Sequence, residues 1–292
     1  MKNDALIDKI LSSKSSRHHY IPQFLIEGFT NNEGLVYVYD KQRNVILKKP
    51  RSPKSIFFEP NRNTIEILDG TSTSFLEEIY SQIDNKTSRV IKCFQNEDIP
   101  KIDITQEQTA FFLYFLITLF WRLPYTDVAA QDVWERSEII STLIDPEIIR
   151  KDTFFQKMER AKLFKHTIDE MNQFGKKGRI SVNIHEFSNN LFVLSDNPIV
   201  FERTPVQFRE FNDIDFLFAV SSRRVYSSTE KKVTNINHLD ALHYNMMSIH
   251  QSVRYTACSD IKLLIESVKL YKAFESYSYE NLIGVWFKRL SC

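Results

Sequence analysis

The longest apolar stretch of the chain, residues 110–121, constrains the fold more than any other segment. Thr105 and Gln108 can form a capping box before it, and Pro124 interrupts the helical pattern after it. A helix that is apolar on every side belongs inside a protein core. A membrane-spanning helix needs about 20 such residues, so this stretch is too short to span. We therefore predict a central buried helix and expect no contact with a membrane.

The order of the remaining patterns predicts an α+β fold that is mainly helical. Apolar residues recur at helical spacing in several long segments, whereas strand patterns gather in others. The predicted helices cover 72–95, 126–145, 152–174, 235–253 and 261–273, and the predicted strands lie within 35–47, 179–194 and 214–227. Residues 283–287 are predicted as a last strand or tail. We expect a small, mostly antiparallel sheet beside the central apolar helix.

Length and composition favour one globular unit. The chain has 292 residues, and we interpret 1–17 as an N-terminal arm and 18–292 as a single globular α+β domain. The net charge of +1 gives no overall field that would attract nucleic acid or a membrane surface. Three widely spaced cysteines indicate reduced thiols, and the polar N-terminus lacks a secretion signal. These features predict a cytoplasmic protein.

Several common catalytic motifs are absent from the sequence. It contains neither of the glycine-rich phosphate-binding patterns GxxxxGK[ST] and GxGxxG. It also lacks the GxSxG elbow of serine hydrolases and the HExxH helix of zinc proteases. These absences argue against the best-known nucleotide-binding, serine-hydrolase and zinc-protease sites.

His19 is the first candidate site residue. It follows His18 and precedes Pro22, and an imidazole can act as a general base or a metal ligand near neutral pH. Adjacent side chains point in different directions, so one of the two histidines would face a site. The alternative is that His19 is a buried structural histidine hydrogen-bonded to the backbone.

Asp196 and Asn197 follow an apolar strand pattern and precede Pro198. Polar groups at the end of a buried strand lie where sites are often built, so Asp196 could bind a metal ion or orient a histidine. The alternative is turn chemistry, because Asp and Asn before proline readily bond to their own backbone.

Arg122 ends the central apolar helix. A buried arginine must be paired with a carboxylate or a bound anion. Asp196, Glu77 and Glu78 are the candidate partners. The alternative to a binding role is structural pairing at the helix C-terminus, where a positive charge also suits the helix dipole.

Several fragments, taken in order, resemble a bacterial family known as domain of unknown function 4238. They are the segment 19–25 (HYIPQFL) with Phe29, then 36–41, 57–59, 120–124 (FWRLP) and 195–198 (SDNP), and finally Asn245, Gln251 and Tyr255. The resemblance implies one compact domain and recurring polar positions at His19, Arg122, Asp196 and Asn197, but no reaction. Residues 26–28 stand where a basic residue is expected, which weakens an anion-binding role for that segment.

Two functional hypotheses follow. In the first, His19, Asp196, Arg122 and Asn197 converge in one pocket as the catalytic residues of a phosphodiester hydrolase. Such an enzyme would be nuclease-like and could serve antiviral defence. It could use a divalent metal ion and act on nucleic acid or a phosphorylated small molecule. In the second, the protein is a non-catalytic binding or scaffolding module and the same cluster stabilises the fold.

Overall fold

The helices and strands confirm the predicted α+β class. The computed structural model describes residues 17–66, 72–96, 105–136, 138, 145–151, 153–174, 183–203, 214–228 and 237–290. The protein is mainly helical, with 52% helix and 18% strand. The helices are α2 (Gln23–Glu27), α3 (Phe75–Gln95), α4 (Gln106–Arg122), α5 (Tyr125–Arg136), α6 (Pro146–Lys151), α7 (Thr153–Phe174), α8 (His238–Gln251), α9 (Ile261–Phe274) and α10 (Tyr279–Leu290).

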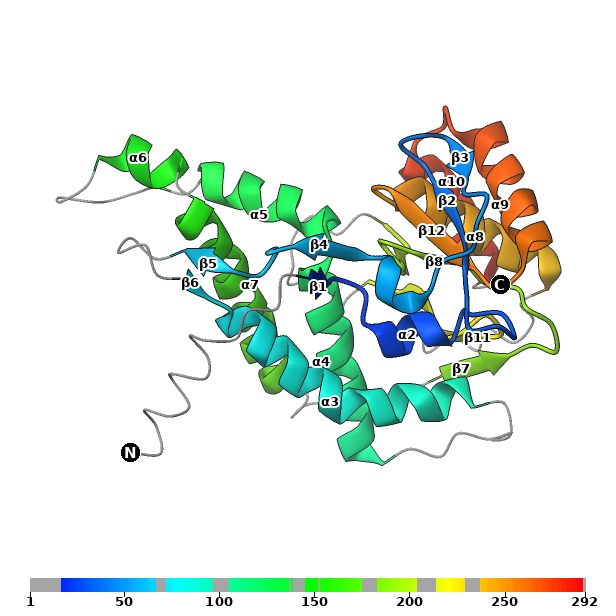
Figure 1. Cartoon of the computed structure of the whole chain (residues 1–292), viewed down its shortest axis with the longest axis horizontal. Helices are drawn as coiled ribbons and strands as arrows, with labels where there is room; N and C mark the ends of the chain where they lie inside the picture. Colours follow the sequence, from blue (N-terminus) through cyan, green and yellow to red (C-terminus); the bar gives the residue numbers. More distant parts are fainter. Residues whose placement is uncertain are drawn as a thin grey trace.

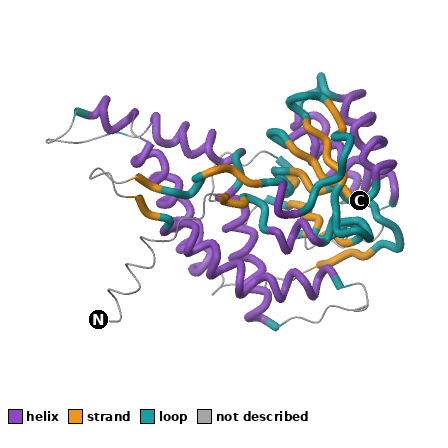
Figure 2. Tube along the Cα trace, viewed as in Figure 1, coloured by secondary structure: helices purple, strands orange, loops and turns teal. Residues whose placement is uncertain are grey.

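The strands form several small antiparallel sheets instead of one. They are β1 (Arg17–His19), β2 (Tyr37–Asp40), β3 (Val45–Ile46), β4 (Phe58–Pro60), β5 (Ile65–Glu66), β6 (Ser72–Thr73), β7 (Asn183–Glu186), β8 (Leu194–Ser195), β9 (Ile199–Phe201), β10 (Phe216–Ala219), β11 (Arg224–Ser227) and β12 (Tyr255–Cys258). Two four-stranded sheets have the orders β7-β11-β10-β9 and β3-β2-β12-β8. Two further pairs, β1-β4 and β5-β6, lie outside them. Figure 2 shows the strands between groups of helices.

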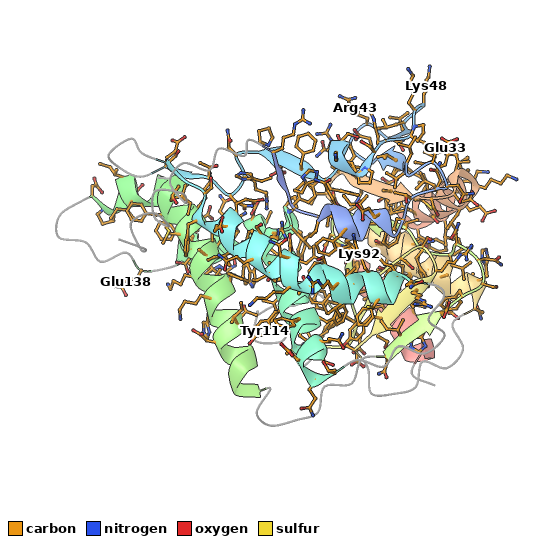
Figure 3. The ribbon with its side chains drawn as sticks, turned by 60° about the horizontal axis from the view of Figure 1, so that its bottom comes forward. Glu33, Arg43, Lys48, Lys92, Tyr114 and Glu138 are labelled. Carbon is orange, nitrogen blue, oxygen red and sulfur yellow. The ribbon has the colours of Figure 1, made fainter. Side chains whose placement is uncertain are left out.

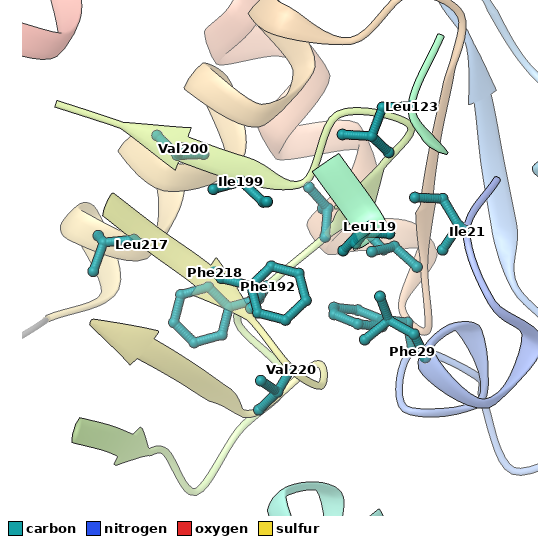
Figure 4. Packing of buried hydrophobic residues seen from close by; sticks show 14 of the residues in the cluster. Ile21, Phe29, Leu119, Leu123, Phe192, Ile199, Val200, Leu217, Phe218 and Val220 are labelled. Atoms are coloured by element: carbon teal, nitrogen blue, oxygen red, sulfur yellow. The ribbon is translucent and has the colours of Figure 1, made fainter. Parts of the chain in front are cut away.

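Helix α4 is the predicted central helix. Thr105 and Gln108 form the expected capping box, and the helix ends at Arg122 before Pro124. The ring centroid of Phe112, in α4, lies 5.0 Å from that of Phe94 on α3 and 4.9 Å from that of Tyr226 on β11. Figure 4 shows Leu119 among apolar side chains of several segments. The apolar stretch therefore joins α3 to the sheet that contains β11.

Figure 1 shows different elements at the two ends of the long axis, with α3, α4, β1 and β4 between them. Helices α5, α6 and α7 lie at one end, while β2, β3, β12 and α8 to α10 lie at the other. Charged side chains such as Arg43 and Lys48 project outward from the latter end (Figure 3). No helix in the described part of the chain is long and apolar enough to cross a membrane.

Two local predictions were wrong. Residues 283–287 belong to helix α10, because Ile283 and Trp286 lie one turn apart and both are buried. Ser72 and Thr73 pair in β6, so α3 begins later, at Phe75. The predicted helix over 126–145 is α5, which ends at Arg136, and residues 137 and 139–144 lie outside the described residues. Residues 1–16 of the proposed arm over 1–17 also lie outside them, whereas Arg17 is the first residue of β1.

Candidate functional site

Asp196 lies directly after β8 and is fully buried. Its carboxylate accepts three backbone hydrogen bonds, from Val253 at 2.8 Å, Arg254 at 2.6 Å and Tyr255 at 2.7 Å. Burial raises the pKa of this carboxyl to about 6, while the three N–H groups and nearby Lys41 oppose the rise. The carboxylate therefore closes the connection between α8 and β12.

Asn197 belongs to the same junction. Its side-chain amide donates to the carbonyl of Gln251 at 3.4 Å, and its own carbonyl accepts from the Ser195 hydroxyl at 2.7 Å. The Gln251 amide also donates to the carbonyl of Ile199 at 2.9 Å. These bonds attach the end of α8 to the turn between β8 and β9.

Arg122 pairs with a residue that the sequence did not suggest. Its Nη1 donates to both carboxylate oxygens of Asp84 on α3, at 2.9 and 2.8 Å. Its Nη2 donates to the carbonyl of His19 at 3.0 Å, and the guanidinium lies 4.9 Å from the ring centroid of Tyr80. The suggested pairing with Asp196 or Glu78 was therefore wrong, whereas Glu77 does interact electrostatically with Arg122, after Asp84. Asp84 lies opposite Arg122 because α3 and α4 pack along their length.

His19 is partly buried, and its ring packs against Phe58, with centroids 5.6 Å apart. Burial lowers the pKa of His19, opposed by hydrogen bonding to the backbone of Pro53. Its Nε2 is enclosed and has no hydrogen-bond partner among the described residues. The fully buried histidine is His18, whose Nδ1 accepts from the backbone N–H of Asn63 at 2.9 Å.

The four predicted site residues lie in two groups. Arg122 hydrogen bonds to the backbone of His19, while Asp196 and Asn197 close the junction between α8 and β12. Neither group lines either of the two pockets described next. Their catalytic roles stay predictions.

A pocket of about 350 Å³ lies between the turn after β4, the start of α5 and one face of α7. We call it the cationic pocket. It is lined by the charged residues Arg62, Lys157, Arg160, Glu59 and Asp127, together with Pro60, Asn61, Ala130 and Gln131. Asn61 has a positive φ of 52°, which Asn tolerates and which turns the chain so that Arg62 enters the protein.

Asp127 connects the two arginines of the cationic pocket. Nη2 of Arg62 donates to Asp127 Oδ1 at 2.9 Å, and Nη1 of Arg160 donates to the same oxygen at 3.0 Å. Arg62 Nη1 also donates to Glu59 at 2.6 Å. Both guanidinium groups are almost fully buried, whereas the side chains of Glu59 and Asp127 are 43% and 45% exposed. The arginines are thus held rigidly, and the carboxylates face solvent.

The cationic pocket retains unused hydrogen-bond donors. One of the three N–H groups of Lys157 donates to the carbonyl of Thr64, at 2.6 Å. Arg160 donates to Asp127 through Nη1 and to the amide oxygen of Asn63 through Nη2, so one further N–H group remains on each of these two atoms, while its Nε is enclosed by the protein. Burial and the two neighbouring arginines lower the pKa of Lys157. An anion entering the pocket could accept hydrogen bonds from these remaining N–H groups of Lys157 and Arg160.

Sequence reasoning missed this pocket. Lys157 and Arg160 are one turn apart on α7 and could have been recognised as one face of the helix. Nothing in the sequence places Arg62 or Asp127 beside them. Among the described residues, no group of three or more His, Cys, Asp or Glu side chains could hold a metal ion, so the divalent ion stays a prediction.

A second, wider concavity of about 830 Å³ lies beside α2, the end of α3 and the turn between β10 and β11. Its charged side chains are largely paired with neighbours. Arg223 donates to Asn190 at 3.1 Å, and Lys92, labelled in Figure 3, lies 3.7 Å from Glu27. Of the two pockets, the cationic pocket therefore has more positively charged side chains with N–H donors that are not engaged in hydrogen bonds.

Comparison with known proteins gives a family without an assigned activity. No curated protein and no solved structure matches the chain. The family model described as protein of unknown function (DUF4238) matches residues 17–260. The matched span runs from β1 to the end of β12 and includes both the cationic pocket and the Asp196 junction. The chain therefore belongs to the DUF4238 family.

Proposed function

We propose that this protein is a binding module for a phosphate-bearing ligand, which it holds in the cationic pocket. The observation that carries the proposal is that Arg62, Lys157 and Arg160 line one cavity. Lys157 and Arg160 have more N–H donors there than hydrogen-bond acceptors. Arginine forks and lysine ammonium groups are the usual protein ligands for phosphate oxygens. Rigid, partly desolvated donors lose less conformational entropy on binding than mobile surface side chains.

In this proposal His19, Arg122, Asp196 and Asn197 stabilise the fold. Two of them, Arg122 and Asp196, are buried charged groups; both carboxylate oxygens of Asp196 and both Nη atoms of Arg122 are engaged by fixed partners. A site that must receive a substrate needs accessible polar groups, whereas a satisfied buried group favours a structural role.

The test is a titration of the protein with inorganic phosphate and with a nucleoside 5′-monophosphate, followed by calorimetry or thermal shift. Lys157→Ala should weaken binding about tenfold or more, because it removes a charge-assisted contact. Lys165→Ala is the matched control, since Lys165 lies on the same helix but is 77% exposed. Equal affinities for the wild type and Lys157→Ala would contradict the proposal.

Phosphodiester hydrolysis, with a role in antiviral defence, is the second candidate function. The observation in its favour is that Glu59 and Asp127 present half-exposed carboxylates beside the cations. A carboxylate at that position could accept a proton from an attacking water molecule while the cations hold the phosphate. Cleavage of a labelled single-stranded oligonucleotide, with and without Mg²⁺ or Mn²⁺, tests it. Activity should be lost in Glu59→Gln and kept in the exposed control Glu33→Gln.

A further inference from the structure

We propose that the cationic pocket selects a phosphodiester, which carries one negative charge, over a phosphomonoester dianion, and that Asp127 is the residue that sets this selectivity. The inference rests on the proposed function, since it concerns which phosphate the pocket accepts. It names the ligand by its chemistry, a phosphate esterified on both sides.

The charges that line the pocket are the first argument. Arg62, Lys157 and Arg160 contribute three positive charges, and Glu59 and Asp127 contribute two negative charges, when all are ionised. One net positive charge remains, which a single phosphodiester charge would neutralise. A dianion would leave one uncompensated negative charge in a partly desolvated site.

Desolvation gives the second argument. The cost of removing an ion from water rises with the square of its charge, whereas its attraction to a fixed set of charges rises only linearly. The free-energy cost of desolvating a dianion therefore exceeds its gain in attraction unless a further cation compensates the second charge. None of the described residues that line this pocket supplies a fourth cation.

The position of Asp127 gives the third argument. Its carboxylate lies on both arginines, with Oδ1 2.9 Å from Arg62 Nη2 and 3.0 Å from Arg160 Nη1. The carboxylate thus occupies the N–H groups of both guanidinium groups that the oxygens of a dianion would otherwise bind. Its negative charge also repels a second negative charge at that position. The N–H groups that remain on Arg160 and Lys157 suffice for the two free oxygens of a phosphodiester.

The experiment compares four probes on the full chain at pH 7.5: a dinucleoside monophosphate, glycerophosphoglycerol, a nucleoside 5′-monophosphate and inorganic phosphate. The two diesters should bind at least about tenfold more tightly than the nucleoside 5′-monophosphate and inorganic phosphate, which can each take a second negative charge. Equal binding of both diesters would mean that the shared phosphodiester is recognised. Binding of the dinucleoside compound alone would identify a nucleotide source, and binding of glycerophosphoglycerol alone a lipid headgroup.

Asp127→Asn should shift the preference toward the monoester by about tenfold, because the pocket gains one unit of positive charge. Glu59→Gln makes the same change of charge from the other side of the pocket and covers the case in which Asp127→Asn does not fold. Asp132→Asn, on the exposed side of α5, is the control and should leave the preference unchanged.

A second measurement needs no variant. The second pKa of a phosphomonoester is about 6, so the nucleoside monophosphate becomes a monoanion as the pH falls from 7.5 to 5. Its affinity for the wild type should rise severalfold over this range. The affinity of the dinucleoside compound should stay constant, which controls for effects of pH on the protein itself.

The outcomes separate the two proposals. If no probe binds, or Lys157→Ala binds all four as tightly as the wild type, the proposed phosphate site is wrong. If all four bind and depend on Lys157, but the monoester binds as tightly as the diesters at pH 7.5, the phosphate site stands and the charge selectivity is overturned.

Discussion

The Asp196 carboxylate accepts hydrogen bonds from the consecutive backbone N–H groups of residues 253–255. An amide in its place has one acceptor oxygen and would turn an NH₂ group toward an N–H donor. Asp196→Asn should therefore lower the free energy of unfolding by about 2–4 kcal/mol. Asp169→Asn, at an exposed carboxylate on α7, should change it by less than about 0.5 kcal/mol. Urea denaturation measures both, and similar small losses would contradict the structural role.

The raised pKa of Asp196 makes stability depend on pH. Because the folded carboxyl titrates near 6 and the unfolded one near 3.8, the folded state binds more protons between those values. The contribution of Asp196 to the free energy of unfolding should fall as the pH rises from about 4 to about 6, by on the order of 3 kcal/mol, and stay constant above. The measurement is the difference in unfolding free energy between the wild type and Asp196→Asn at pH 4.5, 5.5 and 7. A difference that grows with pH would show that the three N–H groups outweigh burial.

At the scale of elements, the ion pair between Asp84 and Arg122 fastens α3 to α4. Asp84→Ala leaves the almost fully buried guanidinium without its carboxylate and should cost about 3–5 kcal/mol of unfolding free energy. Asp132→Ala removes an exposed pair with Arg136 on α5 and should cost less than about 1 kcal/mol. Chemical denaturation of both variants tests this. Equal effects would mean that solvent reaches Arg122 and that α3 and α4 are held together by apolar packing alone.

At the scale of the whole molecule, Gly28 marks a point where three distant segments meet. Its nearest neighbours are the Gln95 side chain at the end of α3 and the carbonyl of Val220 after β10. The Gln95 amide donates to that carbonyl at 3.0 Å and to the carbonyl of Phe24 at 3.1 Å. A side chain at residue 28 would displace this amide from both bonds.

Gly28→Ala should therefore destabilise the protein. A Cβ atom there would lie 2.5 Å from Gln95 Nε2 and 3.0 Å from the Val220 carbonyl oxygen, so the expected loss is about 1–3 kcal/mol. Gly284→Ala, in helix α10, meets no atom within 4 Å and should be neutral or stabilise by about 0.5–1 kcal/mol. Melting temperatures of the two variants, measured side by side, distinguish a close contact from a general effect of replacing glycine. A Gly28→Ala protein as stable as the wild type would show that Gln95 can move at little cost.

Local signals account for what could be predicted. The capping box of Thr105 and Gln108, the apolar residues of α4 and the stop before Pro124 lie within about twenty residues of one another. Such patterns act through the geometry of a single helix, so they need no knowledge of the rest of the fold. The prediction was wrong at 283–287, where a short apolar segment suits a strand or one face of a helix equally well.

The sequence by itself thus determined the α+β class, the buried central helix and the burial of Arg122. Only the tertiary structure decided the partners of the polar residues. Arg122 meets Asp84 across 38 positions, and Arg62 meets Asp127 across 65. A buried charge must find a partner, but its identity depends on which elements pack together, and the alternatives are chemically equivalent carboxylates. Helix packing and the turn at Asn61 brought the two arginines and Lys157 to one pocket.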